Sequence, residues 1–152
     1  MKTRVRGVLV TPDNGVLTIK RVRPTMAPYW VLPGGGVEDS DASLEEALLR
    51  EVREELAGEA RIHSLIHVLV GAEERQLFFL ATIESWDPAK RTGPEFADPA
   101  RGEYHVQEVP LTAAGIASID LKPEQVAELL ADHGPGVFEL TDLRPEWFVT
   151  AS

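Results

Sequence analysis

One strongly helical segment, residues 43–57, constrains the fold most, because stretches that favour strands flank it on both sides. Ser43 followed by Glu46 is the capping-box pattern, in which side chain and backbone satisfy each other at a helix start. Apolar residues recur at helical spacing, at Leu44, Ala47, Leu48, Val52 and Leu56. The segment therefore predicts an amphipathic helix with one buried face.

Strand-like segments precede and follow this helix, and turn residues separate most of them. The predicted strands are residues 3–11, 16–22, 30–32, 61–70, 76–85, 104–109 and 137–143. The first two predict a hairpin, and a loop is expected at 23–29. The triple glycine 34–36 predicts a sharp turn. A second helix is expected at 123–132, and a long loop at 86–102. Strands on both sides of a long helix favour a layered α/β or α+β domain.

Composition limits the classes of protein and partner that fit this chain. Its 152 residues contain 43% hydrophobic side chains, which suits a single domain over residues 1–152. No apolar run approaches the roughly 20 residues that span a bilayer, and no cysteine is present for disulfides or thiolate chemistry. With no export signal, we expect a cytoplasmic protein. Lys and Arg total 15 against 25 Asp and Glu, and the net charge of −10 disfavours long nucleic acid or an anionic membrane as partner.

The predicted helix carries a cluster of carboxylates beside its buried face. At roughly 3.6 residues per turn, Glu51, Glu54 and Glu55 fall within an arc of about 100°. Like charges at these spacings repel by a few tenths of a kcal/mol per pair, and a bound cation relieves that repulsion. Hard oxygen ligands suit Mg²⁺ or Mn²⁺. A solvated acidic helix face is the alternative interpretation.

At these residues the chain resembles the Nudix hydrolase family. The family signature is a glycine, five residues, a glutamate, seven residues, then Arg-Glu-aliphatic-any-Glu-Glu-any-Gly-aliphatic. The run from Arg50 to Glu55 fits its centre, and Gly35 fits its first glycine. Asp41 stands where the family has glutamate, and the connector to Arg50 is one residue longer. Ala57 replaces the closing glycine, with Gly58 next, which predicts a slightly longer helix.

The resemblance implies an α/β/α sandwich with a mixed β-sheet and a metal-dependent active site. Glu51, Glu54, Glu55 and the Gly35 carbonyl would hold divalent metal, Mg²⁺ or alternatively Mn²⁺. Arg50 would orient Glu51 through a charge-assisted hydrogen bond. Family members usually supply one more carboxylate from a later loop as ligand or general base. Glu103 is the favoured candidate; the alternatives are Glu95, Glu73 and Glu74.

Residues elsewhere are candidates for binding the substrate. In the resembling fold Arg21 and Arg23 end a strand near the glycine loop, which suits contacts to phosphate. Gly34, Gly35 and Gly36 offer bare backbone to phosphate or metal. The aromatic candidates for stacking, which equally suit ordinary packing, are Tyr29, Trp30, Phe78, Phe96 and Tyr104. The four histidines show no metal-ligand spacing.

The favoured function is magnesium-dependent hydrolysis of a phosphate–phosphate linkage in a nucleoside diphosphate joined to another group. Ordinary or modified nucleoside triphosphates are the first candidates, and dinucleotides or nucleotide sugars are the alternative. A Nudix-like module that binds nucleotides without hydrolysis is the competing class, and the intact glutamate cluster argues against it. The last alternative is an acidic globular domain without a metal site, for which the match to the whole signature would have to be a coincidence. The expected partner is a small nucleotide, and a homodimer is an open option.

Overall fold

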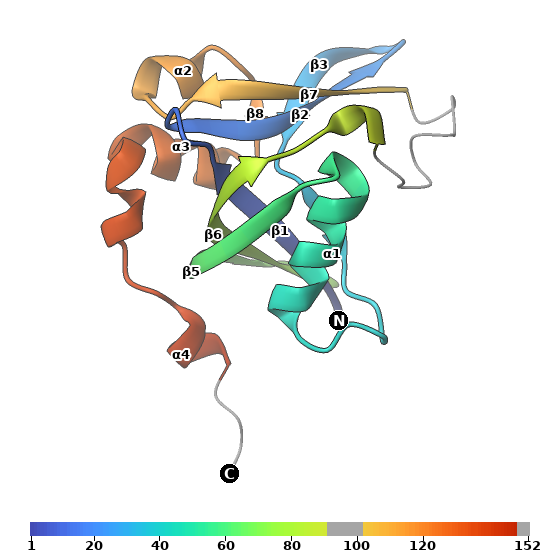
Figure 1. Ribbon diagram of the computed structural model, residues 1–152, viewed down its shortest axis with the longest axis vertical. Helices are drawn as coiled ribbons and strands as arrows, with labels where there is room; N and C mark the ends of the chain where they lie inside the picture. The colour runs from blue at the N-terminus through green and yellow to red at the C-terminus, as the bar shows by residue number, and fades with distance from the viewer. Residues whose placement is uncertain (91–101, 149–152) are drawn as a thin grey trace.

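The computed structural model describes residues 1–90 and 102–148 (Figure 1). The strands are β1 (Lys2–Val10), β2 (Gly15–Arg23), β3 (Met26–Val31), β4 (Gly34–Gly36), β5 (Glu59–Val70), β6 (Glu74–Ser85), β7 (Glu103–Pro110) and β8 (Leu121–Lys122). The α-helices are α1 (Leu44–Leu56), α2 (Ala113–Ala117), α3 (Glu124–His133) and α4 (Arg144–Trp147). Two short 3₁₀ segments are η1 (Pro88–Lys90) and η4 (Gly134–Glu139).

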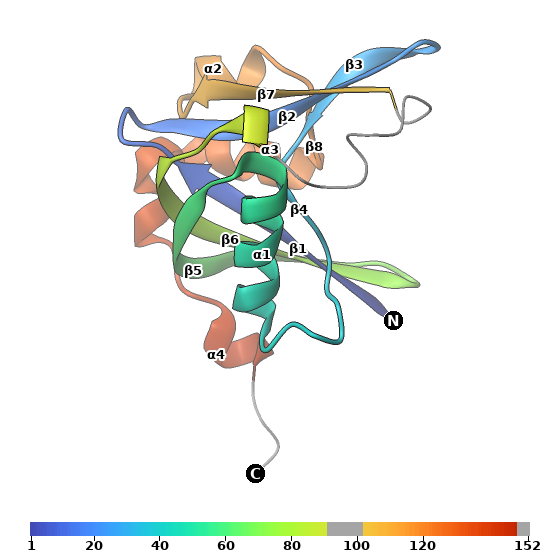
Figure 2. The same cartoon turned by 45° about the vertical axis from the view of Figure 1, so that its right-hand side comes forward.

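The strands form one mixed sheet in the order β5-β6-β1-β2-β3-β8. The β1–β6 and β3–β8 pairs are parallel, and the other pairs are antiparallel. The predicted hairpin joins β1 to β2, but their register contains a single pair, Val10 with Val16. The first half of β1 pairs instead with β4, and β2 pairs with β7. Figure 2 shows β2, β3 and β7 diverging from β1, β5 and β6.

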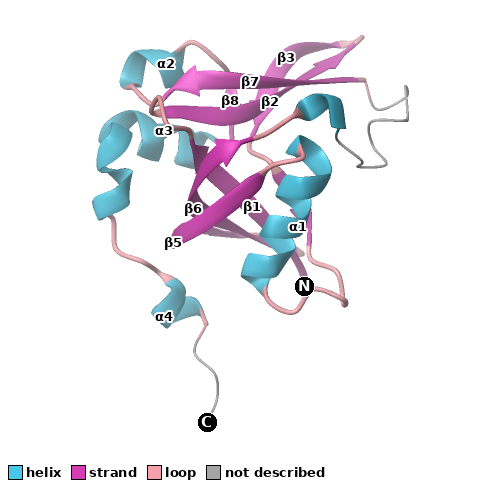
Figure 3. Cartoon of the chain, viewed as in Figure 1, coloured by secondary structure: helices cyan, strands magenta, loops and turns pink. Residues whose placement is uncertain are grey.

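Both faces of the sheet are covered, because side chains alternate between two buried clusters along the central strands. The cluster facing α1 includes Val5, Leu9, Leu77 and Phe79 from the sheet and Leu48 and Val52 from the helix. The cluster on the opposite face includes Val8, Val10, Phe78 and Leu80 with Val126 and Leu130 of α3. Helix α1 and helices α2 and α3 therefore form the outer layers (Figure 3). The predicted α/β/α sandwich with a mixed sheet is confirmed.

Helix α1 begins as its sequence predicts but ends earlier than expected. The Ser43 hydroxyl accepts a 3.0 Å hydrogen bond from the Glu46 amide at the N-cap. At the other end Ala57 is the C-cap in the left-handed conformation, with φ 47° and ψ 42°, and its amide donates to the Arg53 carbonyl. The expected extension is wrong, since Ala57 itself adopts the left-handed conformation that usually favours glycine at a helix end, and α1 ends at Leu56.

We expect Ala57→Gly to raise the free energy of unfolding by about 1 kcal/mol, because the left-handed conformation costs an L-residue roughly that amount. Urea unfolding followed by circular dichroism measures the change. Gly58→Ala is the contrasting variant, because an added Cβ would meet the Ile83 side chain and the Ser85 carbonyl. Its stability should fall, and a loss of stability in Ala57→Gly would contradict the C-cap interpretation.

Three segments differ from the sequence expectations. Strand β3 begins at Met26, inside the expected loop 23–29. The triple glycine is a strand, β4, whose backbone pairs with Arg4–Arg6 of β1. The expected closing strand 137–143 is replaced by the end of η4, which reaches Glu139, and by a segment without regular secondary structure. Glycines give no side-chain pattern, the start of β3 pairs with the end of β2 in a tight hairpin that carries no strong turn signal, and the segment after η4 depends on contacts with the distant strand β5.

The segment after η4 is held along the edge strand β5. Asp142 accepts hydrogen bonds from the Leu65 amide at 3.1 Å and from the Arg144 amide at 3.0 Å. The Leu143 amide donates to the Leu65 carbonyl, and the Arg144 guanidinium binds both Asp142 and the His63 carbonyl. Asp142 therefore links the edge strand β5 to the start of α4.

Every helix in the described part of the chain is too short or too polar to span a bilayer.

The contacts of Asp142 predict that part of the free energy of unfolding is lost in acid. Hydrogen bonds from Arg144 lower the pKa of Asp142 from 3.8 to about 2. A carboxyl whose pKa is depressed on folding contributes stability above about pH 4 and loses it as the pH falls toward 2. Because the side chain is 35% exposed, we expect Asp142→Asn to cost about 1 kcal/mol at pH 6. In urea unfolding this difference should shrink by pH 3, and a pH-independent difference would contradict the assignment.

Candidate active site

A cavity of ≈ 370 Å³ lies where α1 and β4 face β1, β2 and β7. Its acidic lining consists of Glu38, Glu51, Glu54 and Glu55, and its basic lining of Arg4, Arg6, Arg21 and Arg50. Gly34, Gly35 and Gly36 form part of its floor, and Tyr104 lies on the β7 side. The cavity therefore brings the carboxylates of one helix together with guanidinium groups from two strands.

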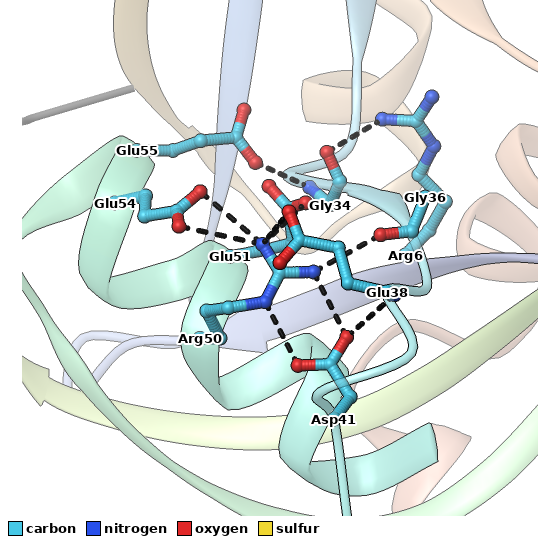
Figure 4. Close-up of polar contacts among 9 residues, drawn as sticks. All are labelled: Arg6, Gly34, Gly36, Glu38, Asp41, Arg50, Glu51, Glu54 and Glu55. Carbon is cyan, nitrogen blue, oxygen red and sulfur yellow. Dashed lines mark hydrogen bonds and ion pairs between the residues drawn. The ribbon is translucent and has the colours of Figure 1, made fainter. Parts of the chain in front are cut away.

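The glycines of β4 let the carboxylates of α1 approach the backbone. The Gly34 amide donates a buried 2.7 Å hydrogen bond to Glu55 Oε1, as Figure 4 shows. Gly34 has φ +148°, and a Cβ there would collide with the Val5 carbonyl. A Cβ on Gly35 would meet the Glu51 carboxylate. These positions therefore require glycine for close approach, a role that a flexible turn would not need.

Arg50 connects the loop to the carboxylates of α1 (Figure 4). Its Nε and Nη2 donate to the two oxygens of Asp41 at 2.9 and 3.0 Å, and Nη2 also donates to the Gly36 carbonyl. Its Nη1 lies 3.2 Å from Glu51 Oε1 and 3.3 Å from Glu54 Oε2. The two-pronged contact of Arg50 is thus with Asp41, whereas its contact with Glu51 is made through Nη1 alone.

The charges of this network stabilise one another. Hydrogen bonding to Asp41 raises the pKa of Arg50 above its ordinary value, and the same contact lowers the pKa of Asp41. Asp41 therefore holds Arg50 in place by two hydrogen bonds.

The three glutamates of α1 differ in exposure. Glu51 and Glu55 are 8% and 5% exposed, whereas the Glu54 side chain is 35% exposed. Within residues 1–90 and 102–148, no three acidic or imidazole side chains are arranged tightly enough to enclose a metal ion as they stand. Arg50 Nη1 contacts both Glu51 and Glu54, so a cation there would compete with it. Carboxylate oxygens flanked by the bare Gly35 backbone are donors that fit Mg²⁺ or Mn²⁺.

Two arginines of β1, Arg4 and Arg6, line the cavity although they were not among the predicted site residues. Arg6 Nη1 donates to the carbonyls of Leu32 and Gly34, and burial lowers the pKa of Arg6 while Glu55 partly offsets that effect. Arg4 forms a 2.8 Å ion pair with Glu74. Arg4 and Arg6 alternate with Val5 and Gly7, and this spacing places both arginines on one face of a strand. That alternation was the available signal.

Most of the predicted site residues share this cavity. They are Arg21, Gly34, Gly35, Gly36, Arg50, Glu51, Glu54 and Glu55. Arg23 and Glu103 instead line a separate cavity of ≈ 520 Å³. A register shift in the β2–β3 pairing separates Arg23 from Arg21. Glu103 precedes Tyr104, and successive side chains of a strand point to opposite faces.

The remaining candidates, apart from Tyr104, are not among the described lining residues of this cavity. Phe78 is fully buried in the sheet core, where it packs against His67. Glu74 is occupied by Arg4, and the Glu73 carbonyl accepts the Lys2 amide. Glu95 and Phe96 lie outside the described residues. Among the aromatic candidates, only Tyr104 belongs to the described lining of the cavity.

Comparison with known proteins agrees with this geometry. The NUDIX domain family model matches residues 1–128. A NUDIX hydrolase structure from Nitrosomonas europaea is 18% identical, with a TM-score of 0.67, covering 99% of this chain and 97% of that one. A NUDIX-family hydrolase from Clostridium perfringens is 16% identical, with a TM-score of 0.62 and coverage of 91% and 96%.

A MutT structure described for Aliivibrio salmonicida and Vibrio cholerae is 20% identical, with a TM-score of 0.57 and coverage of 86% and 97%. No curated protein matched the sequence. The structural likenesses establish the fold, and the family match covers the glycine strand, the whole of α1 and the cavity. The chain therefore belongs to the Nudix family, and it is a hydrolase acting on phosphorus-containing anhydrides.

Proposed function

We propose that the protein hydrolyses a phosphate–phosphate linkage in a nucleoside triphosphate or modified nucleotide, with Mg²⁺ as its metal and Mn²⁺ as a substitute. The carrying observation is the two-sided lining of the cavity. Glu51, Glu54 and Glu55 lie on the α1 side, and Arg6 and Arg21 lie on the strand side. Such a cavity suits a substrate whose phosphates meet metal on one side and guanidinium donors on the other.

Glu51, Glu54 and Glu55 would hold the metal, with the Gly35 carbonyl as a further ligand. When bound, the metal neutralises phosphate charge and lowers the pKa of a coordinated water. The protein residues do the positioning. Asp41 fixes Arg50, and Arg50 fixes Glu51, so that this carboxylate keeps one orientation.

The protein also anchors the far end of the α1 cluster and presents positive charge to the substrate. The Gly34 amide holds one oxygen of Glu55, which fixes this carboxylate at the lining of the cavity. Arg6 is fixed by two backbone carbonyls, so its position is set before substrate arrives. Preorganised donors aimed at phosphate oxygens stabilise developing charge without reorganisation. These residues thus support hydrolysis more than simple nucleotide binding.

The same observations support a setting for the reaction. The net charge of −10 disfavours long nucleic acid or an anionic membrane as partner, whereas Arg4, Arg6, Arg21 and Arg50 supply local positive charge in the cavity for a small nucleotide. We propose a cytoplasmic enzyme. Homodimer formation is a separate expectation, which size-exclusion chromatography with light scattering tests.

An activity screen tests the function directly. Purified protein is incubated with nucleoside triphosphates, modified nucleotides, nucleotide sugars and dinucleotides, with Mg²⁺, Mn²⁺ or a chelator, and products are resolved by ion-exchange chromatography. We expect magnesium-dependent release of a nucleotide with phosphate or pyrophosphate, and no release in chelator. A Glu55→Gln preparation controls for contaminating phosphatase. Saturable nucleotide binding without turnover would contradict hydrolysis, and preference for dinucleotides or sugars would replace the substrate class.

Glu103→Gln tests the carboxylate that the sequence favours as base or ligand. Its side chain is 68% exposed, lies 3.8 Å from His105 Nε2 and lines the other cavity. From this placement we expect kcat to stay within about threefold, because general-base removal typically costs about 100-fold or more. The pH–rate profile is measured alongside. A strong loss of turnover together with loss of the acidic limb would restore Glu103 as the base.

A further inference from the structure

Arg21 stands in the middle of a row of side chains that crosses three strands at the cavity. In the register of the sheet, it pairs with Tyr29 on β3 and with Tyr104 on β7. The guanidinium carbon lies 3.9 Å from the centroid of the Tyr104 ring and 6.0 Å from that of the Tyr29 ring. Arg21 and Tyr104 line the cavity, and Tyr29 is not among its described lining residues. The guanidinium therefore packs closely on the ring at the cavity side.

Such a stack selects one orientation of a long side chain. An arginine in solvent samples many rotamers, and a ring beneath the guanidinium restricts them before a ligand arrives. Stacking uses the face of the guanidinium, whereas its N–H donors point outward in its plane. Planar donors held in this way match the paired oxygens of a phosphate. A ring that supports the arginine can therefore contribute to binding without contacting the ligand itself.

We propose that Tyr104 is a positioning residue, whose ring holds the Arg21 guanidinium at the cavity wall to receive a phosphate of the substrate. The inference rests on the proposed function for the identity of that ligand. This role needs only the face of the aromatic ring, so phenylalanine at position 104 should support Arg21 equally well. The ring acts through Arg21, and its removal weakens substrate binding with little effect on the chemical step.

Kinetics of five variants, four single and one double, test the assignment. We expect Tyr104→Leu to raise KM for the best nucleoside triphosphate by about threefold to tenfold, as cation–π contacts of this kind allow, with kcat within about twofold. Tyr104→Phe should rescue KM. Tyr29→Leu is the matched control, since it removes the more distant ring of the same row, and its KM should stay within about twofold. In an Arg21→Gln background, Tyr104→Leu should add no further rise, because the two residues act as one unit. An equal rise in that background would overturn the proposal, because Tyr104 would then contact the substrate directly.

Two measurements need no turnover. In ¹H–¹⁵N spectra, the Arg21 Hε signal should be displaced by the ring in the wild type and in Tyr104→Phe, and should return to the ordinary arginine position in Tyr104→Leu. Calorimetric titration with magnesium pyrophosphate should show weaker binding for Tyr104→Leu than for Tyr104→Phe. If no nucleotide is hydrolysed, the proposed function fails while these experiments still decide the role of Tyr104. An unchanged Arg21 signal in Tyr104→Leu would overturn it.

Discussion

Glu54→Gln and Glu55→Gln should each lower kcat by at least about 100-fold, equivalent to roughly 2.7 kcal/mol of transition-state stabilisation. Each amide keeps the shape of the carboxylate but loses the charge that a divalent cation needs. At position 55 the amide oxygen can still accept the Gly34 N–H, so the loop should keep its place. The expected defect is therefore chemical, and it is measured by steady-state kinetics across a range of magnesium concentrations.

Folding and metal requirement separate this result from simple damage. Circular dichroism and thermal unfolding of both variants should match the wild type. Glu46→Gln is the matched control, because Glu46 lies on the same helix, is exposed and does not line the cavity in the described part of the chain. Near-normal turnover in both Glu54→Gln and Glu55→Gln, with magnesium still required, would refute the metal role of this helix.

Arg50→Lys should lower kcat by about tenfold or more, because a single ammonium cannot reproduce the planar set of donors. The guanidinium contacts Asp41 with two nitrogens and also reaches Gly36, Glu51 and Glu54. The single nitrogen of lysine cannot span all of these partners, which Arg50 contacts through three separate nitrogens. With Glu51 released from a fixed orientation, the loss should fall mainly on kcat.

Asp41→Asn provides the connected test. It removes the charge that raises the pKa of Arg50 and should weaken turnover less than Arg50→Lys does. The combined variant should be no worse than Arg50→Lys alone, because residues of one network are not additive. If Arg50→Lys raised only KM, Arg50 would bind substrate and its contact with Glu51 would be incidental.

Local features of the sequence predicted the acidic half of the site. Helix α1 depends on its own apolar spacing and on Ser43, and both signals lie within a few residues of the structure they determine. The angular positions of Glu51 and Glu55 follow from that helix. The identity of the base, the metal ion and the substrate does not follow, because those depend on groups brought together by the whole fold.

The positions of the basic residues of the site depend on strand register, which the sequence predicts only weakly. Arg6 reaches the cavity because β1 pairs with the glycine strand β4, and three glycines carry no pattern that announces a strand. Glu103 and Tyr104 are neighbours in sequence, yet strand alternation gives only Tyr104 to the cavity. Phe78 belongs to the buried core, and the sequence alone does not distinguish an aromatic residue of the core from one that lines the site.

The cavity lies between two sets of paired strands, and the register of β1 with β2 contains the single pair Val10–Val16. The carboxylates and Arg6 are tied to the β1 side through β4 and α1, whereas Arg21 and Tyr104 belong to the β2–β7 side. The two walls of the cavity therefore depend on different strand pairings, and the distance between them is set by how the two sets of strands pack through their shared core, where Leu9 of β1 and Leu17 of β2 belong to one cluster.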